Sequence, residues 1–227
     1  MFAHHLRYLY EFENYFRLNF LFFQLKELVI WPTREVINQH MPSEFQKLFP
    51  STRVILDGTE IPIQKLSNVA NQSSTWSSYK NRNTLKCLIG ISPHGCVTYI
   101  SEAYGGAASD RQIFERSDFV REKFLLQKGD SIMADRGFIV QDLMANKDVC
   151  VNTPTMLRGV TQLPAKTVLK DRRLANKRVH VERVIGLAKT FTILKQELDK
   201  NYVVLGGRII FVCFAICNFR PCIVSSK

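Results

Sequence analysis

Three acidic residues, Asp57, Asp135 and Glu182, are the side chains of this sequence that could do chemistry together. Asp57 follows the β-branched and aliphatic run 53–56, and Asp135 follows a second apolar run, 131–134. Each run predicts a strand, and in open α/β sheets ligands bind in the crevice beyond the carboxyl ends of strands. We therefore expect both carboxylates to face a site. The plainer alternative is two turn aspartates, since Asp-Gly is a common turn dipeptide.

Glu182 lies in a stretch whose periodicity predicts a helix. Spacings of four and seven residues place Arg178, Glu182 and Lys189 on one helical face. This arrangement is suited to a glutamate that binds a metal beside nucleic acid, because the flanking cations can contact the phosphates of the backbone. The alternative is a solvated face of surface ion pairs, which are common and contribute little to stability.

The elements that must position these acids alternate between strands and helices. After helical segments within 1–40 and over 43–49, we expect a strand over 53–57 closed by Gly58, and then a hairpin of 85–91 and 96–100. A helix over 111–124 capped by Ser109 and Asp110, a strand over 131–134, a helix over 140–146 and a strand over 149–151 follow. Helices over 175–195 and from Gly206 onward end the chain. This order predicts an α/β fold: a mixed sheet flanked by helices.

Composition points to one globular domain and to an anionic partner. The chain has 227 residues, 46% of them hydrophobic, and a net charge of +11. That charge attracts polyanions, either nucleic acid or an anionic membrane surface. The first 40 residues contain no signal-peptide core, and the apolar run 209–217 is bracketed by Arg208 and Arg220 and is too short to span a bilayer. We expect no membrane partner.

The six cysteines form no tight pairs, which is typical of reduced, buried thiols in an intracellular protein. Cys213, Cys217 and Cys222 could be read as zinc ligands, but apolar residues fill the gaps and no nearby histidine completes a tetrahedral set. We expect the run 209–219 to be a buried helix that contributes core and not a metal site.

The sequence resembles the endonuclease domain of the DDE superfamily from about Asp57 to Lys189, most closely the PIF/Harbinger-type transposases and their domesticated relatives. The matching pieces, in the family's order, are Asp57-Gly-Thr-Glu-Ile61, Tyr79-Lys80, Gly105-Gly106 with Ser109-Asp110, Ser117 with Asp118, Asp135-Arg-Gly-Phe138, and Arg178-Val-His-Val-Glu182-Arg183 with Lys189. The chain departs from relatives in having Ala175 where bacterial members often have a tyrosine, and Asp135-Arg-Gly-Phe138 where Asp-Ser-Gly-Tyr is common.

The resemblance implies an RNase H-like fold and two-metal phosphoryl transfer on DNA. Asp57 would bridge two Mg²⁺ ions, with Mn²⁺ as a substitute, while Asp135 and Glu182 would each support one. Asp110 is the second-choice carboxylate, because as a helix N-cap it already has a structural role. DNA contacts are expected from four cations: Lys80, Arg178, Arg183 and Lys189.

The same resemblance predicts a division of the chain and a nuclear location. Residues 51–222 would be the nuclease domain, and residues 1–50 a helical lead-in, too short and too aromatic for a complete helix-turn-helix. A homodimer and a separate DNA-binding partner protein both stay open. Two other functions also stay open: a domesticated, catalytically silent transposase relative that binds DNA or protein, and a basic structural domain that binds nucleic acid or an acidic protein without catalysis.

Overall fold

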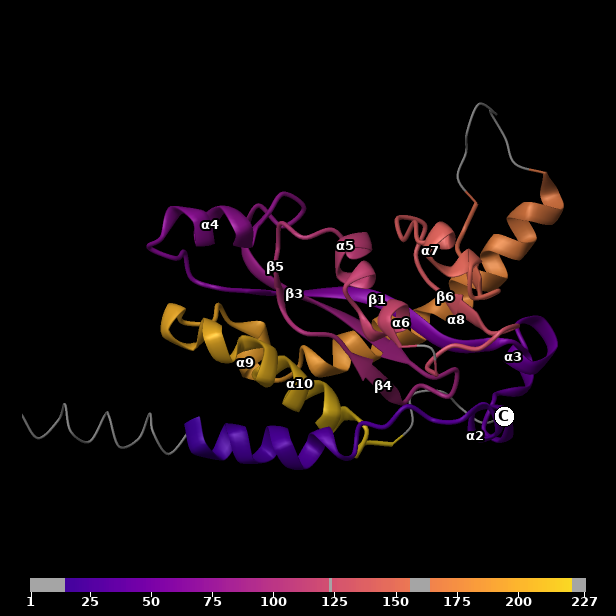
Figure 1. Cartoon of the computed structure of the whole chain (residues 1–227), viewed down its shortest axis with the longest axis horizontal. Helices are drawn as coiled ribbons and strands as arrows, with labels where there is room; N and C mark the ends of the chain where they lie inside the picture. Colours follow the sequence, from indigo (N-terminus) through magenta and orange to yellow (C-terminus); the bar gives the residue numbers. More distant parts are fainter. Residues whose placement is uncertain (1–14, 123, 156–163, 222–227) are drawn as a thin grey trace, which may run out of the picture.

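A computed structural model describes residues 15–122, 124–155 and 164–221 and contains one seven-stranded mixed sheet with helices on both faces (Figure 1). The central strand β1 (Thr52–Pro62) is antiparallel to β3 (Arg82–Ile91) and parallel to β6 (Ser131–Met133), which is parallel to β7 (Cys150–Asn152). Three short strands, β2 (Trp76–Ser77), β4 (Val97–Ile100) and β5 (Tyr104–Gly105), pair with β3. This arrangement is compatible with the RNase H-like fold, and the α/β prediction is confirmed.

Alternation along β1 divides the core into two layers. Val54 and Leu56 pack with α5 (Asp110–Glu115), α6 (Asp118–Arg121) and α7 (Gln141–Ala145) on one face of the sheet. Ile55 and Ile61 pack on the other face, against α8 (Ala165–Ala188), α9 (Thr192–Lys195) and α10 (Gly206–Cys217). Successive side chains of a strand point to opposite faces, so Asp57 belongs to the face that α8 covers.

The first part of the chain packs at the edge of these layers. A helix over 15–26 lies alongside α10, where Leu25 contacts Val212 and Ala215 (Figure 1). Two short helices, α2 (Arg34–Gln39) and α3 (Ser43–Leu48), lead into β1. The expected helix over 43–49 is therefore confirmed to within one residue.

Several expected boundaries were wrong. The strand ending at Asp57 and Gly58 instead continues to Pro62, because its hydrogen bonding to β3 runs through both residues. The expected helix over 111–124 is two helices, α5 and α6, and Phe124 lies beyond both and is exposed. The helix expected from Ala175 begins ten residues earlier and ends at Ala188, with α9 separate from it. Local periodicity did not reveal α4 (Val69–Thr75) or the 3₁₀ helix η1 (Lys200–Leu205).

The last apolar helix is confirmed as part of the core. In α10, Ile210 and Phe214 are fully buried, and Cys213 and Cys217 are buried free thiols. Within the described residues, the window Lys200–Cys217 is apolar and long enough to span a membrane, but half of it is buried inside the protein. We interpret α10 as a core helix. Of the other cysteines, Cys87 is buried, Cys96 and Cys150 are exposed, contrary to expectation, and Cys222 lies outside the described residues.

Candidate active site

Asp57 lies in the middle of the central strand, opposite Ile89 of β3. Its Oδ1 accepts a hydrogen bond of 2.9 Å from the backbone N–H of Gly58. The expectation that this carboxylate follows a strand end was wrong, because β1 continues past it. The alternation of the strand therefore presents the side chain: Asp57 points to the α8 face, between Ile55 and Thr59 along β1.

Asp135 and Glu182 meet at one guanidinium group, that of Arg178. Asp135 follows β6 by two residues, and its Oδ1 lies 2.9 Å from Arg178 Nη1. Glu182, one turn further along α8, places its Oε1 3.8 Å from Arg178 Nη2. Arg178 is only 8% exposed, whereas the side chains of Asp135 and Glu182 are more than half exposed. The predicted face of Arg178 and Glu182 therefore turns toward the end of β6.

The pKa of Asp57 shows that all four groups share one electrostatic environment. Burial raises the pKa of the Asp57 carboxyl to about 6, which Arg178 and the Gly58 N–H partly oppose by stabilising the charged form. The negative charges of Asp135 and Glu182 raise the pKa further. A partly buried carboxyl, two exposed carboxylates and one buried cation therefore interact with one another.

Of the other predicted cations, Lys189 is linked to Asp57 by its electrostatics, and Lys80 is linked to Lys189. Lys189 caps the C-terminus of α8, and its pKa is lowered first by burial and then by the charge of Lys80, while Glu60 and Asp57 oppose the shift. Lys80 is exposed, with its Nζ 4.5 Å from the ring centroid of the exposed Tyr79. Lys189 therefore lies within electrostatic reach of Asp57, and Lys80 within reach of Lys189.

Arg183 points elsewhere. It is exposed on α8, and its charge acts on His180, whose pKa is lowered by burial and then by Lys177 and Arg183. Arg183 is therefore separated around the helix from Arg178 and Glu182, because five residues correspond to a rotation of about 140° from Arg178. Of the four cations expected to contact DNA, the structure places Arg183 alone on this other side of α8.

Asp110, the second-choice carboxylate, lies on the opposite face of β1 from Asp57. A Cβ added to Gly58 would lie 2.6 Å from Asp110 Oδ1, and the Gly58 position points away from Asp57. Lys86 Nζ pairs with Asp110 at 3.0 Å and with Glu60 at 3.9 Å. The N-cap of α5 is Ser109, in a capping box with Gln112, so the expected capping role of Asp110 was wrong. Asp110 is the first residue of the helix, and its carboxylate forms an ion pair with Lys86.

The donor chemistry of the site suits a hard divalent ion, but the spacing of the donors does not bring three of them to one ion. Carboxylate oxygens are the ligands that Mg²⁺ prefers, and Asp57, Asp135 and Glu182 supply them. Across residues 15–122, 124–155 and 164–221, however, no group of three or more His, Cys, Asp and Glu side chains lies close enough to share a metal. Arg178 stands between Asp135 and Glu182 instead.

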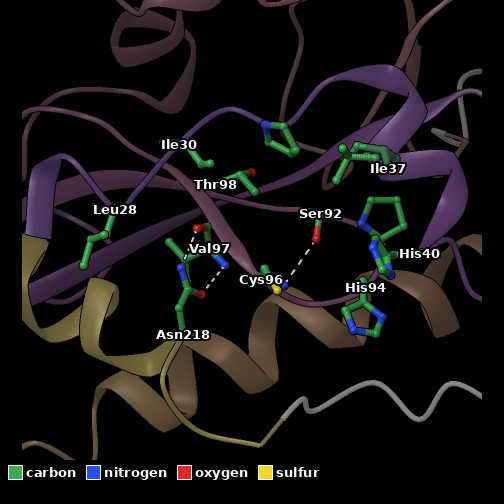
Figure 2. A pocket seen from close by; sticks show the side chains of 13 residues that line it. Leu28, Ile30, Ile37, His40, Ser92, His94, Cys96, Val97, Thr98 and Asn218 are labelled. Carbon is green, nitrogen blue, oxygen red and sulfur yellow. Dashed lines mark hydrogen bonds between the residues drawn. The ribbon is translucent and has the colours of Figure 1, made fainter.

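A separate apolar cavity of about 230 Å³ lies between the segment 28–40, the β3–β4 hairpin and Asn218 (Figure 2). Asn218 closes one side of it by accepting a 2.8 Å hydrogen bond from the Val97 N–H and donating another to the Val97 carbonyl. His40, His94 and Cys96 also line this cavity, though they are not among any described group that could hold a metal. No predicted site residue lines it, so the cavity is distinct from the acidic cluster.

The comparison of the chain with protein families agrees with this geometry. The profile of the DDE superfamily endonucleases matches residues 56–218, which include Asp57, Asp135 and Glu182. Comparisons with curated proteins and with solved structures gave no match. The match covers well over half of the 227 residues. The chain therefore belongs to the DDE superfamily endonuclease family.

Proposed function

We propose that this protein is the nuclease domain of a cut-and-paste DNA transposase of the PIF/Harbinger type, with Asp57, Asp135 and Glu182 as its catalytic carboxylates. One observation carries the proposal. Acids from three elements far apart in sequence, β1, the segment after β6, and α8, interact with one guanidinium: Asp135 and Glu182 as ion pairs and Asp57 through its charge. Two turn aspartates and an unrelated surface ion pair would have no reason to meet in this way.

Each group has a defined part in phosphodiester cleavage. Two Mg²⁺ ions, with Mn²⁺ as a substitute, would activate the attacking oxygen and stabilise the leaving oxygen when bound to the three carboxylates. Lys189, whose charge interacts with those of Asp57 and Lys80, would hold the DNA backbone together with Lys80, because phosphate contacts position a nucleic acid without reading its sequence. The net charge of +11 draws DNA toward this surface.

A second candidate function is DNA or protein binding without catalysis. The ion pairs of Arg178 favour it, since two of the three carboxylates are already neutralised by a cation of the protein itself. A protein of this kind would bind DNA with a steep salt dependence and without any need for Mg²⁺.

The test is cleavage of supercoiled plasmid and of terminal-repeat duplexes with Mg²⁺, with Mn²⁺ and with EDTA, comparing the parent with Glu182→Gln. The amide keeps the shape of the side chain and removes the charge, so the rate of cleavage should fall about a thousandfold. DNA affinity should stay level or rise slightly, because a negative charge beside the backbone is removed. Glu197→Gln, which makes the same change at an exposed position outside the cluster, should cleave at the parental rate.

Two results decide against the nuclease. One is a Glu182→Gln variant that cleaves as fast as the parent. The other is a parent that binds DNA but never cleaves it with either ion, which would favour the binding protein. Lys189→Ala should weaken DNA binding and flatten its dependence on salt in either case, so it reports on the DNA contact separately from the chemistry.

A further inference from the structure

We propose that Arg178 is a built-in counter-cation of the acidic cluster, and that it competes with divalent ions for Asp135 and Glu182. The inference rests on the proposed function, since it assumes that the three carboxylates bind such ions. It goes further in giving Arg178 a role other than the DNA contact expected from the sequence: this guanidinium sets how tightly the site takes up a metal.

The position of Arg178 supports this role over a phosphate contact. The residue is 8% exposed, and its two terminal nitrogens are directed to Asp135 at 2.9 Å and to Glu182 at 3.8 Å. Its charge also opposes the rise in the pKa of Asp57. A cation that is buried and already directed to two carboxylates has little surface left for a DNA backbone. Arg178 acts on the acids, and the more exposed Lys80 is better placed for DNA.

The competition follows from the chemistry of the two partners. Guanidinium N–H groups and a divalent ion both bind carboxylate lone pairs, and arginine stays protonated at any ordinary pH, so it cannot withdraw by losing its charge. An ion that binds Asp135 Oδ1 or Glu182 Oε1 therefore competes with Arg178 for that oxygen, and an ion on the other oxygens meets the repulsion of the guanidinium charge.

The Nε of Arg178 offers a reason why displacement is feasible. This atom is buried and has no hydrogen-bond partner among the described residues. A buried donor without an acceptor is unfavourable, so the present arrangement of the guanidinium is not fully satisfied. Arg178 thus pairs with Asp135 and Glu182 through its Nη atoms, while its Nε has no hydrogen-bond acceptor among the described residues.

The test is the binding of Mn²⁺, measured by titration calorimetry and by electron paramagnetic resonance, without DNA and without any readout of cleavage. Arg178→Gln should bind Mn²⁺ about tenfold more tightly than the parent or better, because the ion pairs of the guanidinium with the two carboxylates no longer oppose the ion. Lys189→Gln removes one positive charge near Asp57 with no ion pair to Asp135 or Glu182. Its smaller gain, about threefold or less, measures the general effect of charge.

Thermal unfolding gives a second readout that keeps the proposal testable if folding is affected. In EDTA, Arg178→Gln should melt below the parent, because the carboxylates repel one another, and Mn²⁺ should raise its melting temperature more than it raises the parent's. Arg178→Lys keeps the charge but cannot serve both carboxylates at once, so its Mn²⁺ affinity should lie between those of the parent and Arg178→Gln.

Each outcome separates this inference from the proposed function. Equal Mn²⁺ affinity in the parent, Arg178→Gln and Arg178→Lys overturns the competition and leaves the nuclease standing. Weaker Mn²⁺ binding in Arg178→Gln also overturns it, since the arginine would then organise the site for the ion. Binding of Mn²⁺ by none of the proteins overturns both proposals.

Discussion

Asp57 has a carboxyl group in the middle of an eleven-residue strand, where an uncharged side chain would fit more easily. Ile55 and Thr59 flank it on the same face of β1, Ile89 lies opposite, burial is the main cause of its raised pKa, and two further carboxylates act on it. A carboxyl group in this position lowers the free energy of unfolding. Charged groups that destabilise the fold in this way are typical of functional sites. The same reasoning predicts how the stability of the protein depends on pH.

Asp57→Asn should stabilise the protein in EDTA at pH 8, by up to about 3 kcal/mol, which is the free energy of a pKa raised from about 4 to about 6. Because the folded-state pKa lies above the unfolded one, the penalty for ionised Asp57 is present above pH 6 and disappears as the pH falls toward 4. The amide oxygen can still accept the hydrogen bond from the Gly58 N–H. Urea unfolding at pH 8 and pH 4.5 measures this, and a variant that is less stable than the parent at both values would show that Asp57 is a structural residue.

Among the helices and strands, a close backbone contact explains the glycine pair, and core packing explains the apolar C-terminal helix. Gly105 lies in β5, where an added Cβ would be 2.2 Å from the carbonyl oxygen of Ser74 at the end of α4. The glycine pair found in the sequence therefore lets a strand and a helix approach each other. On the other side of the sheet, α10 contributes a fully buried phenylalanine, Phe214, to the layer that supports Asp57 and α8.

Phe214→Ala should destabilise the protein by about 3–5 kcal/mol, because it removes a fully buried ring and leaves a cavity beneath the sheet. Val204→Ala, in η1 just before α10, changes a side chain that is 92% exposed and should shift the free energy of unfolding by about 0.5 kcal/mol or less. Urea unfolding of the two variants provides the comparison. Equal stability of Phe214→Ala and the parent would mean that α10 is not part of the folded core in solution.

At the scale of the whole molecule, a buried ion-pair group ties the segment before β1 to the sheet. Asp130, 2% exposed and just before β6, pairs with Arg34 at 2.6 Å and with the buried Arg53 at 3.6 Å. Arg53 also donates a 2.9 Å hydrogen bond to the carbonyl of Pro32. This carboxylate therefore adds a polar attachment between the segment before β1 and the sheet, beside the packing of the helix over 15–26 on α10.

Asp130→Asn should destabilise the protein by about 3–5 kcal/mol, because Arg53 would be left buried without its counter-charge. The asparagine oxygen can still accept the hydrogen bond that Asp130 Oδ2 accepts from the Gln127 N–H, so the loop itself should persist. Hydrogen exchange should rise first over the segment containing Pro32 and α2. The exposed pair Lys128–Asp148 supplies the control, since Asp148→Asn should cost less than about 1 kcal/mol. Uniform exchange across the molecule would contradict the attachment.

The amino-acid sequence was enough to predict the main strands, the hairpin, the buried C-terminal helix and the three motifs with acids, because periodicity, turn residues and motif spacing are local properties. Only the tertiary structure decided that Asp57 lies within a strand, since pairing with β3 extends β1 past the turn-like Asp-Gly pair. It likewise decided that Asp110 belongs to the opposite face and that Arg178 turns toward Asp135, forty-three residues earlier in the chain. These outcomes depend on contacts between distant residues, which no local pattern records.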